Sequence, residues 1–415
     1  MDDHHEYEQR LADLNELGLR RRLRLISGPQ GPRVLLDGNP VLLLCSNNYL
    51  GLADHPRVRQ AAADAAMRWG VGAGASRLVS GTMTIHRRLE ERLADFEGSE
   101  ACLLFGSGYL ANLGVVSALT EAGDVVLSDE LNHASIVDGC RLSRAETVVY
   151  RHCDVEHLDW SLRQAGERRA LIVTDSVFSM DGDVAPLTEI VELARRHDAR
   201  IVVDEAHATG ALGPGGRGAV AEAGLGEEVD VVVGTLGKAL GSYGAYVCCD
   251  RVLADYLVNR SRPLIFSTAP PPPAVAGALA ALELLEEQPR RVDRLAANAA
   301  LLRDELDREG FQTAGTTTQI IPLVVGDPAT AMSLCEVAIE RGVFAQAIRP
   351  PTVPAGTSRL RLTVMASHTR GELRQAAQVL GRAAVQVGFR PGTGLPVAAA
   401  QAALVDEIPA VPRAA

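Results

Sequence analysis

The strongest constraint on the fold is an alternation between short β-branched runs and helix-length amphipathic segments over residues 101–249. Almost uninterrupted Val and Ile runs indicate strands that are buried on both faces, and the helices between them supply the crossovers that parallel strands need. The sequence therefore predicts an α/β fold with a mostly parallel, doubly wound sheet. The expected strands are residues 125–127, 147–150, 170–174, 200–203, 229–233 and 245–248.

The segments on either side of this region predict additional parts. Leucines spaced along an acidic N-terminal segment indicate a helical arm, and a cluster of prolines at residues 270–273 opens a long helical stretch. Beyond that stretch, strands at 319–325 and 359–364 with helices at 329–341 and 374–387 predict a small C-terminal α+β domain. The expected division is an arm over residues 1–45, a large domain over 46–285, a small domain over 286–390 and a poorly ordered tail over 391–415.

Charge and composition narrow the class of protein. With 41 basic and 52 acidic residues the net charge is −11, which disfavours nucleic acid as the main partner. No apolar stretch reaches the ~18 residues that a membrane span needs, and the polar first ten residues do not resemble a secretory signal. We therefore expect a cytoplasmic protein without a membrane partner. The seven cysteines contain no C-x-x-C pair, so we expect no metal site.

One residue is unusual by its rarity. Lys238 is the only lysine in the chain, and every other basic residue is arginine. A lysine amine can lose its proton and form a Schiff base with a carbonyl, whereas a guanidinium stays protonated at any accessible pH. A coding bias towards arginine would also leave few lysines, so the count alone does not assign a role.

Asp204 and His207 follow the predicted strand 200–203, at the strand end where open α/β sheets bind ligands. The run Asp204-Glu205-Ala206-His207 allows two interpretations. It could be the acidic box of a helicase, or Asp204 could be a buried counter-ion for a cofactor with His207 as a nearby donor. A helicase needs a phosphate loop upstream, but the Gly237-Lys238 pair lies downstream and lacks the required Gly and Ser or Thr.

Two glycine-containing segments follow other predicted strands. The run Gly106-Ser107-Gly108-Tyr109 precedes a helix, whose free N–H groups suit a phosphate, although a tight strand-to-helix turn explains it equally well. The run 234–238, which ends at Lys238, lies one βα crossover after Asp204 and so belongs to the same sheet edge. A lysine, a buried carboxylate and a phosphate cradle together fit pyridoxal 5'-phosphate.

Several long motifs carry a family resemblance over residues 10–390. The chain resembles the α-oxoamine synthases, a group of fold-type I pyridoxal-phosphate enzymes. The motifs are residues 46–52 (SNNYLGL), 132–135 (NHAS), 177–183 (VFSMDGD), 204–210 (DEAHATG) and 235–238 (TLGK). The resemblance implies a large domain with a mostly parallel sheet, a small C-terminal domain and a homodimer.

The resemblance also implies a cofactor site. Lys238 would hold pyridoxal phosphate and act as the catalytic base, and Asp204 would pair with the ring nitrogen. The other implied cofactor contacts are His133, which stacks on the ring, Ser179 and His207 at the ring hydroxyl, Gly108, Tyr109 and Thr235 at the phosphate, and Ser267 and Thr268 at the phosphate of a partner subunit's cofactor. His133 could instead cap a helix.

Residues 348–362 resemble the branch of the group that makes 8-amino-7-oxononanoate in biotin synthesis. This implies decarboxylative condensation of L-alanine with pimeloyl-CoA or a pimeloyl-carrier protein, releasing CO2 and the thiol. The implied substrate contacts are Asn47 and Arg361 at the amino-acid carboxylate, Thr352 within the segment, and Arg21 at the distal part of the acyl donor. Arg361 could also be a satisfied core charge, and Arg21 part of an exposed face.

Three alternatives remain open at the level of the sequence. A sibling synthase, such as glycine C-acetyltransferase, would share every catalytic residue and differ only in substrate. A dinucleotide-dependent dehydrogenase is a different class of enzyme. A non-catalytic partner subunit of the same fold is a third class, and the presence of Lys238 argues against it.

Overall fold

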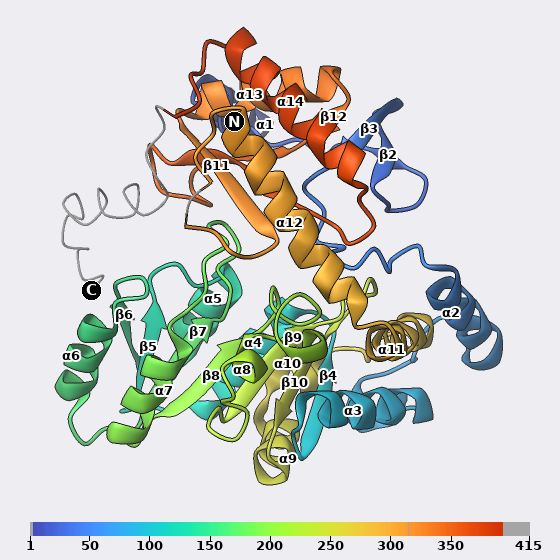
Figure 1. The fold of residues 1–415 in the computed structure, drawn as a ribbon. Helices are drawn as coiled ribbons and strands as arrows, with labels where there is room; N and C mark the ends of the chain where they lie inside the picture. The colour runs from blue at the N-terminus through green and yellow to red at the C-terminus, as the bar shows by residue number, and fades with distance from the viewer. Residues whose placement is uncertain (1–2, 314, 393–415) are drawn as a thin grey trace. The chain divides into compact units, whose positions relative to one another are not determined.

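A computed structural model describes residues 3–313 and 315–392 (Figure 1). The described residues form two compact units. The large unit consists of Asn47–Ser179 and Asp183–Leu295, and the small unit of Met180–Gly182 with the described parts of Met1–Ser46 and Ala296–Ala415. Apart from residues 391 and 392, the predicted tail lies outside the described residues. No described helix has the length and apolar character needed to cross a membrane.

A seven-stranded sheet forms the centre of the large unit, in the order β4-β10-β9-β8-β7-β5-β6. Its neighbours from β6 to β9 pair in parallel, and β10 pairs antiparallel with both β9 and β4. This confirms the predicted mostly parallel sheet. The strands are β4 Ala101–Phe105, β5 Val125–Asp129, β6 Glu146–Tyr150, β7 Ala170–Asp175, β8 Arg200–Asp204, β9 Val231–Thr235 and β10 Ala245–Cys249.

Helices pack on the two faces of this sheet because the strands are apolar on both sides. Helices α4, α5, α9 and α10 enclose a core with inward residues such as Val126, Val202 and Val247, whereas α3, α6 and α7 pack on other strand residues. The helices are α2 Pro56–Trp69, α3 Thr84–Glu97, α4 Gly108–Leu119, α5 Ala134–Leu142, α6 Val155–Ala165, α7 Leu187–Arg196, α8 Ala219–Glu222, α9 Arg251–Arg260, α10 Arg262–Phe266 and α11 Pro272–Glu287, with short turns η1 Arg77–Gly81 and η2 Pro214–Gly216.

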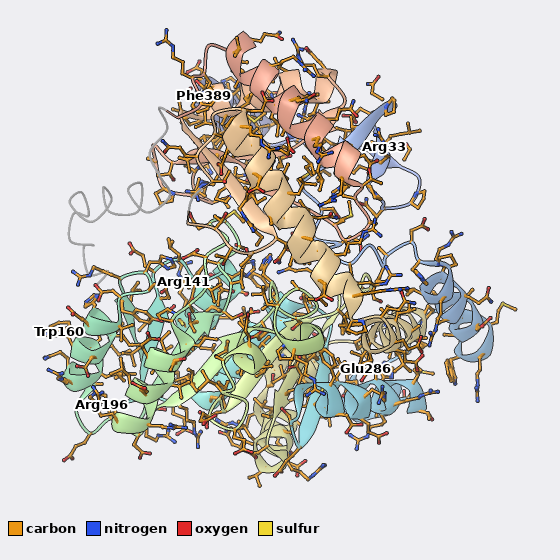
Figure 2. The ribbon with its side chains drawn as sticks, viewed as in Figure 1. Arg33, Arg141, Trp160, Arg196, Glu286 and Phe389 are labelled. Carbon is orange, nitrogen blue, oxygen red and sulfur yellow. The ribbon has the colours of Figure 1, made fainter. Side chains whose placement is uncertain are left out.

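The outer helices show the expected amphipathic pattern. Leu158 and Leu162 of α6 are buried, while Trp160 on its other face is 55% exposed and is visible at the outside of the molecule (Figure 2). Asp154 caps the start of α6 by accepting a hydrogen bond from the His157 amide. Apolar spacing and a capping carboxylate therefore account for this helix from sequence alone.

The small unit combines both ends of the chain. Strand β12 pairs in parallel with β3, so residues near 42 and 343 become neighbours. Arg349 donates to the backbone carbonyl of Gly18, which fixes the N-terminal arm on this unit. The elements are α1 Asp3–Glu16, β1 Ile26–Ser27, β2 Arg33–Leu36, β3 Asn39–Leu43, β11 Ile320–Gly326, α13 Pro328–Glu340, β12 Val343–Phe344, β13 Gln346–Ile348, β14 Ser358–Thr363 and α14 Arg370–Gln386, while α12 Arg290–Arg308 spans both units.

Residues 286–295, which the sequence assigned to the small domain, group with the large unit. The division into an arm, a large domain and a small domain stays a prediction. The predicted strand at residues 229–233 is observed two residues later, as β9.

Candidate active site

Polar side chains collect at the carboxyl ends of the parallel strands. Asp129, Asp175 and Asp204 are the last residues of β5, β7 and β8, and each is buried. Thr235 ends β9. Parallel strands bring their carboxyl ends to the same edge, so the topology brings these four residues to one side of the sheet.

Lys238 lies in the connection from β9 to β10. Thr235 pairs with Ala245 at the end of the antiparallel ladder, and the turn is closed by hydrogen bonds from Leu236 N to Gly244 O (2.9 Å) and from Ser242 N to Leu236 O (2.8 Å). Lys238 itself is half-buried. The sole lysine is thus carried by a short turn that the sheet fixes at both ends.

A chain of hydrogen bonds begins at the lysine. Lys238 Nζ lies 2.7 Å from His207 Nε2, and His207 Nδ1 lies 2.7 Å from the Tyr49 hydroxyl. That hydroxyl lies 3.1 Å from Asn47 Oδ1. Asn47 and His207, both predicted site residues, are therefore connected to Lys238, and Tyr49 joins them.

Asp204 is the centre of a second cluster. Its Oδ2 accepts a hydrogen bond of 2.6 Å from Asn112 Nδ2, and its Oδ1 accepts one of 2.8 Å from the Ala206 amide. Asn112 Nδ2 also lies 2.9 Å from Ser135 Oγ. Ser135 Oγ in turn lies 2.7 Å from His133 Nδ1, so this cluster connects Asp204 to His133.

His133 has the helix-capping role that the sequence offered as an alternative, and its stacking on a cofactor ring stays a prediction. It caps α5, since its Nδ1 accepts from the Ser135 amide at 3.2 Å, and its own amide donates to Asp175 Oδ2 at 2.7 Å. Burial lowers the pKa of the His133 ring, and the charge of Lys238 acts in the same direction while that of Asp204 opposes it. A neutral imidazole held in place in this way is suited to stacking on a ring.

The carboxylates are suited to a cationic ring nitrogen. Asp204 is 4% exposed, and its carboxylate accepts hydrogen bonds from Asn112 and from the Ala206 amide. Burial and the charge of Asp204 raise the pKa of Asp175 well above its usual range. A buried carboxylate without a cation is costly, and a pyridinium N–H would compensate it.

Helix α4 provides amides suited to a phosphate. Ser107 Oγ accepts from the Leu110 amide at 3.3 Å and so caps the helix, whereas the amides of Gly108 and Tyr109 lie in the first turn, where no intrahelical acceptor exists. The Tyr109 hydroxyl donates to Asp138. The Thr235 hydroxyl already donates to Gly244 O at 3.1 Å, so donating to a phosphate requires that this bond breaks.

The other predicted residues are carried by other segments of the chain. Ser179 follows β7, and Ser267 and Thr268 follow α10, where Thr268 forms an isolated antiparallel bridge with Ser76. The remaining three belong to the small unit: Arg361 is buried in β14, and Arg21 Nη2 donates to Thr352 Oγ1 at 3.3 Å. Arg21 is exposed, but the alternative that it belongs to a helix face is wrong, because Arg21 lies beyond the end of α1.

Sequence reasoning missed Asn112, Ser135 and Tyr49 as individual site residues. Ser135 and Tyr49 stand inside motifs that carried the family resemblance. Asn112 is fully buried in α4, a helix that is apolar on all sides. A polar side chain in such a helix needs a buried partner, and that was the available signal.

Comparison with known proteins decides the family. Residues 39–380 match the family model described as aminotransferase class I and II. The chain is 52% identical over 382 residues to the 8-amino-7-oxononanoate synthase of Geobacter sulfurreducens, covering 91% of this chain and 98% of that protein. It is 54% identical over 381 residues to the synthase of Anaeromyxobacter dehalogenans, covering 92% and 94%. The chain belongs to the 8-amino-7-oxononanoate synthase family.

Solved structures confirm the fold class. Serine palmitoyltransferase of Sphingomonas wittichii has a TM-score of 0.88 at 34% identity, covering 93% of this chain and 98% of that one. A structure of SPT with PLP has a TM-score of 0.89 at 32% identity, covering 94% and 100%. The 8-amino-7-oxononanoate synthase of Francisella tularensis has a TM-score of 0.73 at 25% identity, covering 84% and 99%. The family is thus one of fold-type I enzymes, and its solved neighbours include a pyridoxal-phosphate complex.

Proposed function

We propose that this chain condenses L-alanine with pimeloyl-CoA, or with a pimeloyl-carrier protein, to give 8-amino-7-oxononanoate, CO2 and the free thiol in biotin synthesis, as a homodimer with pyridoxal phosphate. The observation that carries the chemistry is the sole lysine, Lys238, 2.7 Å from His207 at the sheet edge where Asp204 is buried. The identity of 52–54% to named synthases supports the choice of substrates.

Bound pyridoxal phosphate supplies an electron sink for negative charge at the amino-acid Cα. Lys238 would hold it through its amine, and Asp204 would keep its ring nitrogen protonated, with Asn112 fixing the carboxylate by a 2.6 Å hydrogen bond. His133 would stack on the ring. The Gly108 and Tyr109 amides would bind the phosphate at the positive end of α4.

The chain's own residues also handle the proton. Nζ of Lys238 is the base for the Cα proton of alanine, and His207 holds that nitrogen in place by the 2.7 Å contact. Tyr49 fixes the other ring nitrogen of His207. Asn47, at the end of this chain of hydrogen bonds, and Arg361 would bind the alanine carboxylate.

The test is thiol release by the cofactor-loaded protein. Pimeloyl-CoA should release thiol with L-alanine, and much less with glycine or L-serine, while acetyl-CoA should release little with any of them. A preference for glycine with acetyl-CoA would reject the biotin-pathway assignment and move the chain to a sibling synthase.

Two variants separate the lysine chemistry from its charge. Lys238→Ala and Lys238→Arg should both fold and both lose turnover, because neither side chain forms a Schiff base. Borohydride should reduce the lysine–cofactor C=N bond to an amine, so on the wild-type protein alone the yellow colour should be lost and the cofactor should stay attached after denaturation. Multiple turnovers by either variant would exclude Lys238 as the anchor and base.

A further inference from the structure

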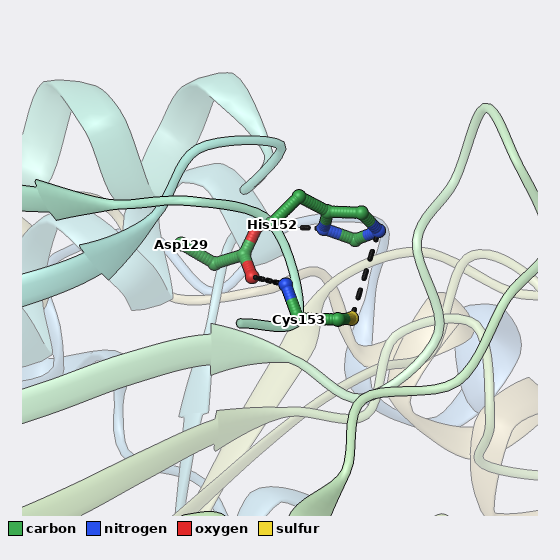
Figure 3. Close-up of side chains that lie close together, drawn as sticks. All are labelled: Asp129, His152 and Cys153. Atoms are coloured by element: carbon green, nitrogen blue, oxygen red, sulfur yellow. Dashed lines mark hydrogen bonds and ion pairs between the residues drawn. The ribbon is translucent and has the colours of Figure 1, made fainter. Parts of the chain in front are cut away.

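His152, which has no place in the proposed chemistry, stands between two carboxylates at the same sheet edge. Its Nδ1 lies 2.8 Å from Asp129 Oδ1 and its Nε2 lies 2.6 Å from Asp183 Oδ2 (Figure 3 draws the Asp129 side). The His152 side chain is 9% exposed, that of Asp129 1% and that of Asp183 26%. An ion pair of this kind, with both ring nitrogens engaged, holds an imidazole in one orientation.

The same cluster contains a thiol, which raises the possibility of a metal site. Cys153 Sγ lies 3.6 Å from His152 Nε2 and 4.0 Å from Asp183 Oδ2. However, each ring nitrogen of His152 faces a carboxylate oxygen, so each carries a proton and neither offers a lone pair. Burial disfavours the charged ring, but the hydrogen bonds from Asp129 and Asp183 outweigh it and raise the pKa of His152 to about 12. The geometry therefore favours a cationic bridge over a metal ligand.

Each of the two acidic residues anchors a segment that leads to a predicted site residue, Asp129 through its carboxylate and Asp183 through its backbone carbonyl. Asp129 Oδ1 also accepts from the Leu131 amide at 2.9 Å, and His133 stands two residues further along the chain. Asp183 O accepts from the Phe178 amide at 3.0 Å, and Ser179 is the next residue. The Phe178 ring meets the His152 ring edge-on, with centroids 4.3 Å apart.

We propose that His152 is a positioning residue of the active site, an imidazole bridge that holds the turn before His133 and the segment before Ser179 in place together. The inference rests on the proposed function, since it assumes that His133 and Ser179 contact the cofactor. Removal of the ring leaves two acidic side chains facing each other without their cation, which is costly when buried. Both segments should then loosen.

The first test needs no cofactor. Hydrogen exchange is measured on the wild-type protein, on His152→Gln and on Cys153→Ala as the matched control. His152→Gln should increase exchange in residues 131–136 and in residues 177–179, and Cys153→Ala should change neither. An increase in hydrogen exchange confined to residues 150–155 would contradict the proposed bridge.

The second test measures pyridoxal phosphate affinity under conditions where circular dichroism shows each variant folded. His152→Gln should weaken affinity at least tenfold, and Cys153→Ala should remain within twofold of the wild type. A lowered Tm with an unchanged Kd would show that His152 only stabilises the fold. If the wild-type protein itself binds no pyridoxal phosphate, the proposed function fails, and the exchange experiment alone decides whether His152 bridges the segments.

Two additional results keep the inference testable if His152→Gln does not fold. Asp183→Ala removes one arm of the bridge, so it should increase exchange in residues 177–179 but leave residues 131–136 unchanged. Dialysis against Zn²⁺ tests the alternative that His152, Cys153 and the carboxylates form a metal site. One bound equivalent that Cys153→Ala abolishes would overturn the bridge in favour of a metal site.

Discussion

At the scale of single residues, the site is arranged before any ligand binds. Asp204 is fixed by Asn112, and the amine of Lys238 is fixed by His207. In both cases the partner is itself held, Asn112 by Ser135 and His207 by Tyr49. Such preorganised polar groups need little rearrangement when charge develops at the reacting atoms.

The role of Asn112 can be tested by deletion of its amide. Asn112→Ala removes one of the two donors to the buried Asp204 carboxylate, and a hydrogen bond to a charged group is worth roughly 1.5–3 kcal/mol. We expect a loss of that size in the free energy of unfolding and weaker pyridoxal phosphate binding. Ser117→Ala, on the same helix, is the control and should cost less than about 1 kcal/mol. Equal losses in the two variants would contradict the assignment.

The sequence identified Lys238, Asp204 and His207 because each stands beside a recognisable strand end. It did not identify Asn112, since the partner of a buried amide depends on which helix face meets which strand, and this is settled only by packing. For Thr235 the prediction stays untested, but its hydroxyl is already committed to Gly244 O.

At the scale of elements, two features carry the site: the first turn of α4 and the turn between β9 and β10. Periodicity located both regions. It could not predict that β10 runs antiparallel to its neighbours, because an apolar run has the same pattern in a parallel and in an antiparallel strand. The two-residue strand β12 and the three-residue β13 are too short to show a period at all.

The cap of α4 gives a prediction that separates stability from phosphate binding. Ser107→Ala should cost about 1 kcal/mol of stability, because the Leu110 amide loses its acceptor. Ser107→Asp keeps an acceptor and adds a negative charge, so it should preserve Tm and weaken pyridoxal phosphate binding. Unchanged affinity for Ser107→Asp would place the phosphate elsewhere.

The β9–β10 pair gives a packing prediction. A methyl group at Gly234 would lie 2.1 Å from the ring of Tyr246, its partner across the ladder, so Gly234→Ala should destabilise by roughly 1–3 kcal/mol or more. Gly237→Ala is the control, since its nearest atoms would be 3.7 Å away. Chemical denaturation distinguishes them, and a neutral Gly234→Ala would refute the close approach.

At the scale of the whole molecule, the small unit shows what sequence patterns leave out. Its strands β11 and β14 and its helices α13 and α14 were predicted, but β12 and β13 were not, and the pairing of β3 with β12 joins segments about 300 residues apart. No local pattern reports such a pairing. The large unit is more predictable because its order follows repeated βα crossovers with a fixed hand.

Buried acidic groups make global stability depend on pH. Burial raises the pKa of Glu97 from 4.5 to about 7, although the Tyr246 hydroxyl donates to it, and burial with the charge of Glu97 raises the pKa of Glu205 to about 8. A carboxyl whose pKa is higher in the folded state stabilises that state below its unfolded pKa, and the contribution is lost as the pH rises through the folded value.

Wild-type stability should therefore fall from about pH 4.5 to about pH 7 relative to a variant in which Glu97 cannot ionise. Glu97→Gln keeps an acceptor for Tyr246 but does not ionise. The free energy of unfolding of Glu97→Gln, relative to that of the wild type, should increase by roughly 1.4 kcal/mol per pH unit until about pH 7 and then level off. Urea titrations across this range provide the measurement, and parallel curves for the two proteins would contradict it.

The half-buried lysine in the turn between β9 and β10 has a practical consequence. The chain has one ε-amino group, and it belongs to the proposed active site. Reagents that couple to amines, such as fluorescent esters or activated beads, can therefore react only there or at the α-amino terminus. Labelling at neutral pH will modify the α-amino terminus. The fraction of Lys238 that carries dye will then report the fraction of protein molecules whose site held no cofactor.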